Sequence, residues 1–115
     1  MPIENIQIVT TVGARHGHKV LALTGTLNIH TIFDFQNAVR ADASPALIVD
    51  FSGVPYMDSA GLGAVIGAHV AAQRTQRRIA FAGMNERLNT LIEMSHLGQV
   101  LRIYPTVAEA ETALG

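Results

Sequence analysis

The sequence predicts a single α/β domain that spans the whole chain, residues 1–115, and is built around a mixed sheet. Its length of 115 residues is close to the commonest size of one domain. Hydrophobic residues make up 49% of the chain and charged residues 15%, a composition typical of folded globular proteins. From residue 31 onward, segments with a helical period alternate with short apolar runs. That alternation predicts crossover units, whose strands pair in parallel.

The first two predicted strands form a hairpin. In residues 6–12, isoleucine, threonine and valine occupy every second position, which is the period of a strand. The glycine-containing segment 13–18 interrupts this pattern, and residues 19–25 ("KVLALTG") read as the second strand. Two strands joined by a short glycine-containing loop are typical of an antiparallel pair.

The period changes to that of a helix after Thr31, because Ile32, Phe35 and Val39 recur at helical spacing among polar residues. Residues 46–51 ("ALIVDF") then form a nearly continuous apolar run rich in β-branched side chains. Such a run suits a central strand that is covered on both faces.

The second half of the chain repeats the alternation of helices and strands. A long helix is expected from about Ala60 to Gln76, with its apolar residues on one face. The remaining predicted elements are a strand at 79–83, a helix that Asn85 caps, a strand at 100–104 and a short helix at 107–114. The sheet is therefore expected to have about four to five strands.

Composition excludes several classes of function. The formal charge of −1, with 8 basic and 9 acidic residues, leaves no basic surface of the kind that nucleic acids require. The chain has no cysteine, so disulfides and thiolate zinc sites are excluded. The longest apolar-rich stretch, 62–72, is too short to span a bilayer, and the first residues lack the pattern of a signal peptide. We therefore expect a cytoplasmic protein without membrane insertion.

The histidines do not predict a metal site. His16 and His18 are two residues apart in the first loop, but no carboxylate cluster accompanies them, so we interpret them as solvated. His69 lies on the apolar face of the long helix and is expected to be partly buried and hydrogen-bonded.

The junction of Asp58 and Ser59 allows three interpretations. Both residue types are good helix N-caps, and a cap is the most frequent role of such a pair before a helix. Ser59 is also a reasonable acceptor for phosphorylation. A catalytic serine is the weakest interpretation, because "DSAGLG" is not the G-x-S-x-G elbow and no histidine is spaced to act as its base.

Three features suggest more than a cap. Gly61 and Gly63 occupy the first helical turn, where glycine costs up to about 1 kcal/mol, so a close approach by a partner or a neighbouring backbone is expected. Tyr56 and Met57 precede the cap in a loop where we expect them to be partly exposed. The junction also follows the carboxyl end of a central parallel strand, where open α/β sheets place binding sites.

A phosphate on Ser59 is predicted to switch binding rather than folding. It adds a charge of roughly −1.5 to −2 at neutral pH, which the N-terminus of a helix accommodates. Asp58 beside it repels the same charge, so the surface presented to a partner changes strongly.

The stretch "LIVDFSGVPYMDSAGLGAVIGAH" resembles the signature of the STAS domain family, and in particular its small stand-alone anti-sigma factor antagonists. The segments "LTGTLN" and "NERLNTLIEMSHLGQVLRIYPTVAEA" extend the resemblance over nearly the whole chain. The resemblance implies helices packed mainly on one side of the sheet, no catalytic activity and no cofactor. A monomer suffices for this role.

The resemblance also implies a switch in partners. The unphosphorylated form of such a protein binds an anti-sigma factor that is a serine kinase, which frees the sigma factor. The kinase then phosphorylates the serine that matches Ser59, and a metal-dependent serine phosphatase reverses the change. Ala60 stands where the family often has a second serine or threonine. Asn28 stands where its turn usually has aspartate, and we interpret Asn28 as shaping that turn.

The surface that contacts the partner is predicted to surround Ser59. Its expected residues are Asn28, His30, Tyr56, Met57, Asp58, Ser59, Gly61, Leu62 and Gly63, of which Leu62 could instead belong to the core. Two other functions remain open. One is a STAS subunit of a lipid-transport or stress-signalling complex that is not regulated through a sigma factor, and the other is an unrelated serine enzyme.

Overall fold

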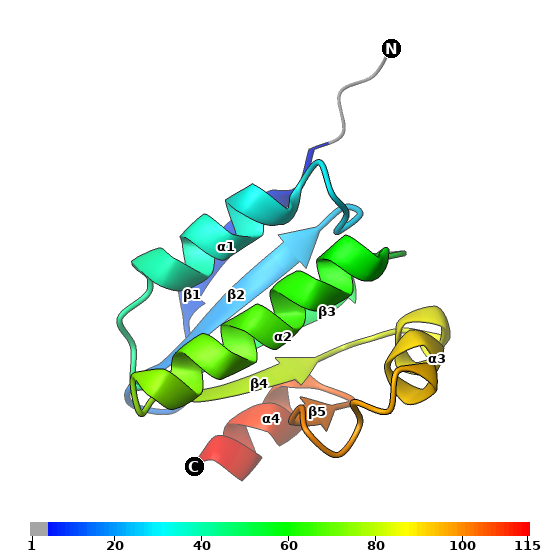
Figure 1. Ribbon diagram of the computed structural model, residues 1–115. Helices are drawn as coiled ribbons and strands as arrows, with labels where there is room; N and C mark the ends of the chain where they lie inside the picture. Colours follow the sequence, from blue (N-terminus) through cyan, green and yellow to red (C-terminus); the bar gives the residue numbers. More distant parts are fainter. Residues whose placement is uncertain (1–4) are drawn as a thin grey trace.

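The computed structural model describes residues 5–115 and confirms the predicted order of elements (Figure 1). Along the chain these are β1 (Gln7–Val12), β2 (His18–Thr24), α1 (Ile32–Ala41), β3 (Ala46–Gly53), α2 (Ser59–Arg74), β4 (Arg78–Ala82), α3 (Glu86–Met94), β5 (Ile103–Tyr104) and α4 (Val107–Leu114).

The strands form one mixed sheet in the order β1-β2-β3-β4-β5. β1 pairs with β2 antiparallel, and the three other pairings are parallel, as the hairpin and the crossover pattern predict. In register, Leu21 of β2 lies beside Val49 of β3, which lies beside Phe81 of β4. β3 is therefore the central strand, and its carboxyl end leads directly to the Asp58–Ser59 junction.

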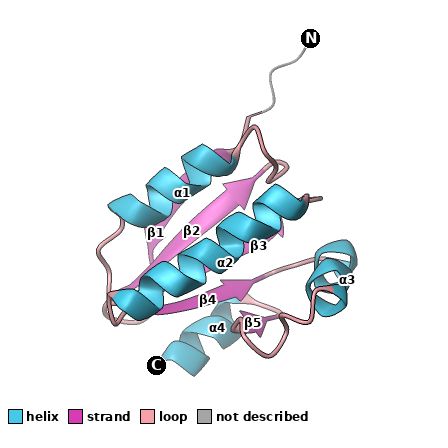
Figure 2. Cartoon of the chain, viewed as in Figure 1, coloured by secondary structure: helices cyan, strands magenta, loops and turns pink. Residues whose placement is uncertain are grey.

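Helices cover both faces of the sheet: α1 and α2 lie across one face and α4 lies behind the other (Figures 1 and 2). The larger core lies between the sheet and α1, α2 and α3, and it includes Val49 and Phe51 of β3. The smaller core lies under α4, where Ile48 of β3 packs with Ala110 and Leu114. Alternate residues of β3 thus face the two cores, which explains its continuous apolar sequence. The prediction of helices mainly on one side is confirmed.

The last strand is shorter than predicted. β5 contains only Ile103–Tyr104, whereas the sequence favoured a strand over 100–104. The N–H groups of Val100 and Leu101 donate instead to the carbonyl of Leu97, which closes a turn before the strand begins. The apolar residues of this segment therefore do not all belong to the sheet, because the backbone N–H groups of Val100 and Leu101 bond within a turn instead of to a neighbouring strand.

The interpretation of His18 as a solvated loop residue is wrong. Its side chain is buried and lies 3.0 Å from Glu111 of α4, measured between His18 Nδ1 and Glu111 Oε1. The same carboxylate accepts hydrogen bonds from the backbone N–H groups of Ala14 and Arg15. Glu111 therefore ties the terminal helix to the loop between β1 and β2, across 93 residues of sequence.

These contacts set the charge state of Glu111. Burial opposes ionisation, but the N–H groups of Ala14 and Arg15 and the ring of His18 outweigh it, so the pKa of Glu111 is lowered from 4.5. The carboxylate is therefore ionised at neutral pH.

His69 of α2 is buried, as expected, but the hydrogen bond predicted for it is not found at Nδ1, which has no partner among residues 5–115. Within the same described part of the chain, no helix is long and apolar enough to cross a membrane.

Candidate functional site

α2 begins at Ser59, and the preceding aspartate caps it. Asp58 has extended backbone angles, and its Oδ1 accepts a hydrogen bond of 2.9 Å from the N–H of Gly61. The serine is thus not needed to satisfy the first turn of the helix. Its side chain is exposed, and the described residues offer its hydroxyl no hydrogen bond.

The loop before α1 lies against this junction. Leu27 donates its N–H to the carbonyl of Tyr56 at 3.1 Å and accepts from the N–H of Asp58 at 3.2 Å, which forms a short parallel bridge. The second carboxylate oxygen of Asp58 accepts from the N–H of Ile29 at 3.3 Å. Asp58 therefore holds two loops together and places residues 28–30 beside Ser59.

Asn28 shapes the turn within this loop. Its Oδ1 accepts from the N–H of His30 at 2.9 Å, and its own N–H donates to Thr31 Oγ1 at 2.9 Å. Asn28 is buried, whereas His30 is exposed. These contacts are those of a turn-forming asparagine, and they agree with the interpretation drawn from the sequence.

The nine residues predicted to contact a partner divide between surface and interior. Those that reach the surface are His30, Tyr56, Ser59, Gly63 and, in part, Asp58. Those that are buried are Asn28, Met57, Gly61 and Leu62. The buried residues do not contact a partner directly, and they affect binding only by shaping the surface above them.

The expectation that Met57 is partly exposed is wrong. Its side chain is 1% exposed and belongs to the larger core, whereas that of Tyr56 is 45% exposed. The bridge between Met57 and Leu27 extends the parallel pairing beyond β3. Neighbouring residues of an extended segment point to opposite sides, so Met57 faces inward where Tyr56 faces outward.

The two glycines of the first turn have different environments. A β-carbon on Gly61 would stand 2.3 Å from the carbonyl oxygen of Leu27, so a neighbouring backbone makes the close approach there. A β-carbon on Gly63 would meet nothing within 4 Å. Packing inside the protein thus explains Gly61 but not Gly63, which is exposed.

Sequence reasoning missed the contribution of α3 to this site. The guanidinium carbon of Arg87 lies 5.3 Å from the centre of the Tyr56 ring. Arg87, Tyr56, Asp58 and Ser59 line one hollow of about 250 Å³ between the start of α2 and α3, together with Met57, Leu88, Thr90, Leu91 and Met94. Only Asn85 gave a signal for this arrangement, because its predicted cap fixes where α3 begins.

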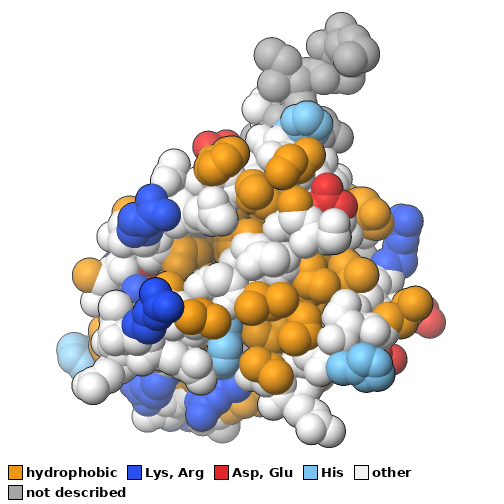
Figure 3. All heavy atoms as spheres, viewed as in Figure 1, with side chains coloured by type: hydrophobic (Ala, Val, Ile, Leu, Met, Phe, Trp, Pro, Cys, Tyr) orange, Lys and Arg blue, Asp and Glu red, His pale blue; other side chains and the backbone are white. Residues whose placement is uncertain are grey.

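Apolar side chains are exposed around the same end of the molecule. The exposed fractions are 55% for Ile29, 66% for Phe33 and 74% for Met94. On the face shown in Figure 3, hydrophobic side chains gather over the helices, with charged side chains toward the edges. Exposed aromatic and methionine side chains are typical of protein–protein contacts.

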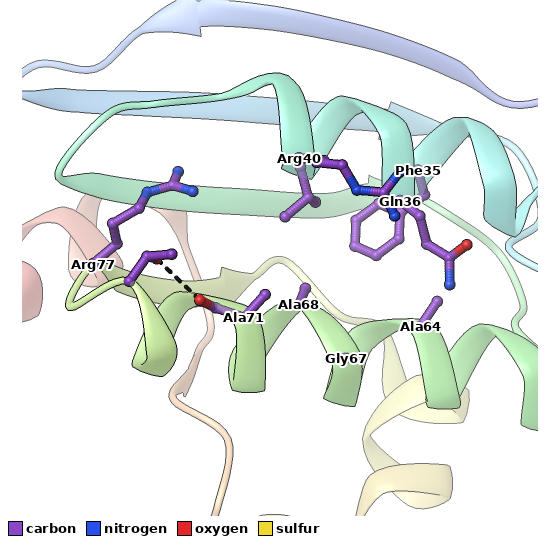
Figure 4. Close-up of a pocket in the computed structure, with 10 residues that line it drawn as sticks. Phe35, Gln36, Arg40, Ala64, Gly67, Ala68, Ala71 and Arg77 are labelled. Carbon is purple, nitrogen blue, oxygen red and sulfur yellow. Dashed lines mark hydrogen bonds between the residues drawn. The ribbon is translucent and has the colours of Figure 1, made fainter.

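A second hollow, of about 280 Å³, lies between α1 and α2 (Figure 4). Ala64, Gly67, Ala68 and Ala71 of α2 form one wall, and Phe35, Gln36, Val39 and Arg40 of α1 contribute to the other. Neither hollow contains a serine with a histidine beside it, and the described residues contain no group of three metal-ligating side chains.

Comparison with known proteins gives a consistent result. A family model described as "STAS domain" matches residues 7–110. The anti-sigma-B factor antagonist of Staphylococcus aureus is 26% identical over 82 residues, which cover 69% of this chain and 76% of that protein.

Solved structures show the same fold. The crystal structure of an anti-sigma factor antagonist from Mycobacterium paratuberculosis has a TM-score of 0.78 at 24% identity, and the match covers 94% of each chain. The Bacillus cell fate determinant SpoIIAA, in its phosphorylated form, has a TM-score of 0.67 at 20% identity. That match covers 95% of this chain and 100% of SpoIIAA.

Proposed function

The chain belongs to the STAS domain family, and on this premise we propose that it is an anti-sigma factor antagonist controlled by phosphorylation of Ser59. In its unphosphorylated form it binds an anti-sigma factor that is a serine kinase, and the sigma factor is released. Phosphorylation of Ser59 ends this binding, and a metal-dependent serine phosphatase restores it. The protein acts in the cytoplasm as a binding module and catalyses no reaction.

The observation that carries the proposal is that Asp58 and Ser59 have different structural roles. Asp58 caps α2 and fixes the neighbouring loop, while the hydroxyl of Ser59 is exposed and bonded to none of the described residues. A kinase requires an accessible hydroxyl. A switch that acts on binding also requires that the modification leave the fold intact. Ser59 meets both requirements because the helix does not depend on it for capping.

A phosphate at this position changes the contact surface more than the domain. It adds roughly −1.5 to −2 charge beside the carboxylate of Asp58, close to the exposed apolar residues Ile29 and Met94. An interface that buried this charge would pay a large desolvation cost unless the partner supplied a cation. The start of the helix tolerates the same charge, since its free N–H groups favour anions.

The direct test is phosphorylation by an anti-sigma factor serine kinase. The wild-type chain is incubated with such a kinase and ATP, and peptide mass spectrometry locates the phosphate. Ser59→Ala should abolish the modification. Ser52→Ala is the matched control, because Ser52 is also exposed but its hydroxyl donates to Asp50 at 2.8 Å, and this variant should be modified like the wild type.

Two outcomes would count against the proposal. Phosphate found only at other residues would remove Ser59 as the switch. If the unphosphorylated and phosphorylated proteins bound the partner equally well, the second function would be favoured instead. That function is a STAS subunit of a lipid-transport or stress-signalling complex.

A further inference from the structure

Arg87 lies where a phosphate on Ser59 would need a cation. Both residues line the hollow of about 250 Å³ between the start of α2 and α3, and Figure 1 shows these two elements at the same end of the molecule. The ionisable side chains of this lining are Tyr56, Asp58 and Arg87, so Arg87 is its one basic group.

The guanidinium of Arg87 is available for a stronger partner. It is exposed and lies over the ring of Tyr56, with 5.3 Å between its central carbon and the ring centre. Within residues 5–115, no carboxylate forms an ion pair with it. A cation–π contact at an exposed site is weaker than a bidentate, charge-assisted pair between arginine and phosphate.

α3 is fixed in position to present this side chain. Asn85 caps the helix by accepting from the N–H of Leu88 at 2.9 Å, and its Nδ2 donates to the carbonyl of Pro55 at 3.2 Å. One residue thus ties the start of α3 to the segment that leads into Tyr56 and Ser59. Arg87 and Ser59 line the same hollow, so the movement that the inference requires is one of the Arg87 side chain from the ring toward Ser59.

We infer that Arg87 is an intramolecular binding group for the phosphate on Ser59. When the phosphate is added, the guanidinium leaves the face of Tyr56 and forms paired hydrogen bonds with the phosphate oxygens. The ring of Tyr56 is uncovered, and the hollow beside Met94 is closed by the new pair. This inference rests on the proposed function, because it assigns a structural consequence to the same modification.

The experiment installs the phosphate without a kinase. Phosphoserine is incorporated at position 59 during translation of the full chain, and phosphorus NMR follows the second ionisation of the phosphate as a function of pH. A neighbouring guanidinium favours the doubly charged form. The apparent pKa of the phosphate should therefore be lower in the wild-type background than with Arg87→Gln, by about half a unit.

Arg74→Gln is the matched control, because Arg74 is exposed at the other end of α2 and the net charge changes equally. It should leave the phosphate pKa as in wild type, and Arg87→Lys should give an intermediate value because lysine cannot pair in bidentate fashion. The ring signals of Tyr56 should also shift on phosphorylation in the wild-type background and not with Arg87→Gln. Equal pKa values for Arg87→Gln and Arg74→Gln would overturn the inference.

This test is independent of the proposed function. Failure of a kinase to modify Ser59 would refute the proposed regulation but would leave the NMR result unaffected. An unchanged pKa in the presence of normal kinase modification would refute the role of Arg87 alone.

Discussion

Gly61 lies so close to Leu27 that a β-carbon on Gly61 would stand 2.3 Å from the Leu27 carbonyl oxygen. The same carbonyl accepts from the N–H of Asp58 at 3.2 Å, and Asp58 caps the helix through the N–H of Gly61. The loop before α1 and the start of α2 therefore share one compact set of backbone contacts. Ser59 lies between Asp58 and Gly61, within this set of contacts.

The first prediction separates Gly61 from Gly63. Gly61→Ala forces the loop at Leu27 away from the helix and should lower the free energy of unfolding by about 1–3 kcal/mol. Gly63→Ala is the matched control, since a β-carbon there meets nothing within 4 Å. It should raise stability by about 0.5–1 kcal/mol, because alanine favours the helical backbone over glycine. Urea unfolding measures both values, and equal stabilities for the two variants would contradict the role of Gly61.

The second prediction concerns the buried pair of Glu111 and His18. Glu111→Gln leaves His18 and the N–H groups of Ala14 and Arg15 facing a neutral amide, and stability at pH 7 should fall by about 1–3 kcal/mol. The measurement is urea unfolding of both proteins across a range of pH.

The pH dependence follows from the direction of the Glu111 pKa, which is lowered from 4.5. A carboxyl whose pKa is lower in the folded state stabilises the fold above its unfolded pKa, and this contribution is lost as the pH falls through the folded value. The difference between wild type and Glu111→Gln should thus be constant near neutrality and should shrink below about pH 4.5. A difference that grows with acidification would contradict the assignment.

The third prediction distinguishes Met57 from Tyr56, two neighbours that were both expected to be partly exposed. Met57→Ala removes a side chain that is 1% exposed and should cost about 2–5 kcal/mol of stability. Tyr56→Ala removes a side chain that is 45% exposed and should change stability little, but it should weaken binding to the anti-sigma factor. Thermal unfolding and titration calorimetry test the pair, and loss of binding with Met57→Ala alone would move the contact elsewhere.

Local patterns were sufficient to predict the parts of the site that depend on neighbouring residues. Asp58 caps α2 and Asn85 caps α3 through side-chain bonds to residues three positions along, so short-range sequence rules found both. The central position of β3 followed from its continuous apolar sequence for the same reason.

The errors concern side chains whose surroundings come from distant parts of the chain. Met57 is buried because it bridges to Leu27, and His18 is buried because it pairs with Glu111. The contact of Arg87 with Tyr56 likewise joins α3 to a loop 31 residues earlier, and a single sequence contains no spacing rule for such contacts. The fold and the two helix caps were thus predictable, whereas the side-chain contacts between distant parts of the chain were not.

The last prediction tests whether Ser59 controls binding without controlling folding. Ser59→Asp places a negative charge at the start of α2, where the helix dipole favours it, so the melting temperature should stay within a few degrees of wild type. Under the proposed function, affinity for the anti-sigma factor should fall, because the added charge lies beside Asp58 within the proposed contact surface. Thr112→Asp is the matched control, since it adds the same charge on an exposed position of α4, on the opposite face of the sheet. It should bind like wild type. Unfolding of Ser59→Asp would assign the serine a structural role. If both variants weakened binding equally, the effect would come from net charge alone.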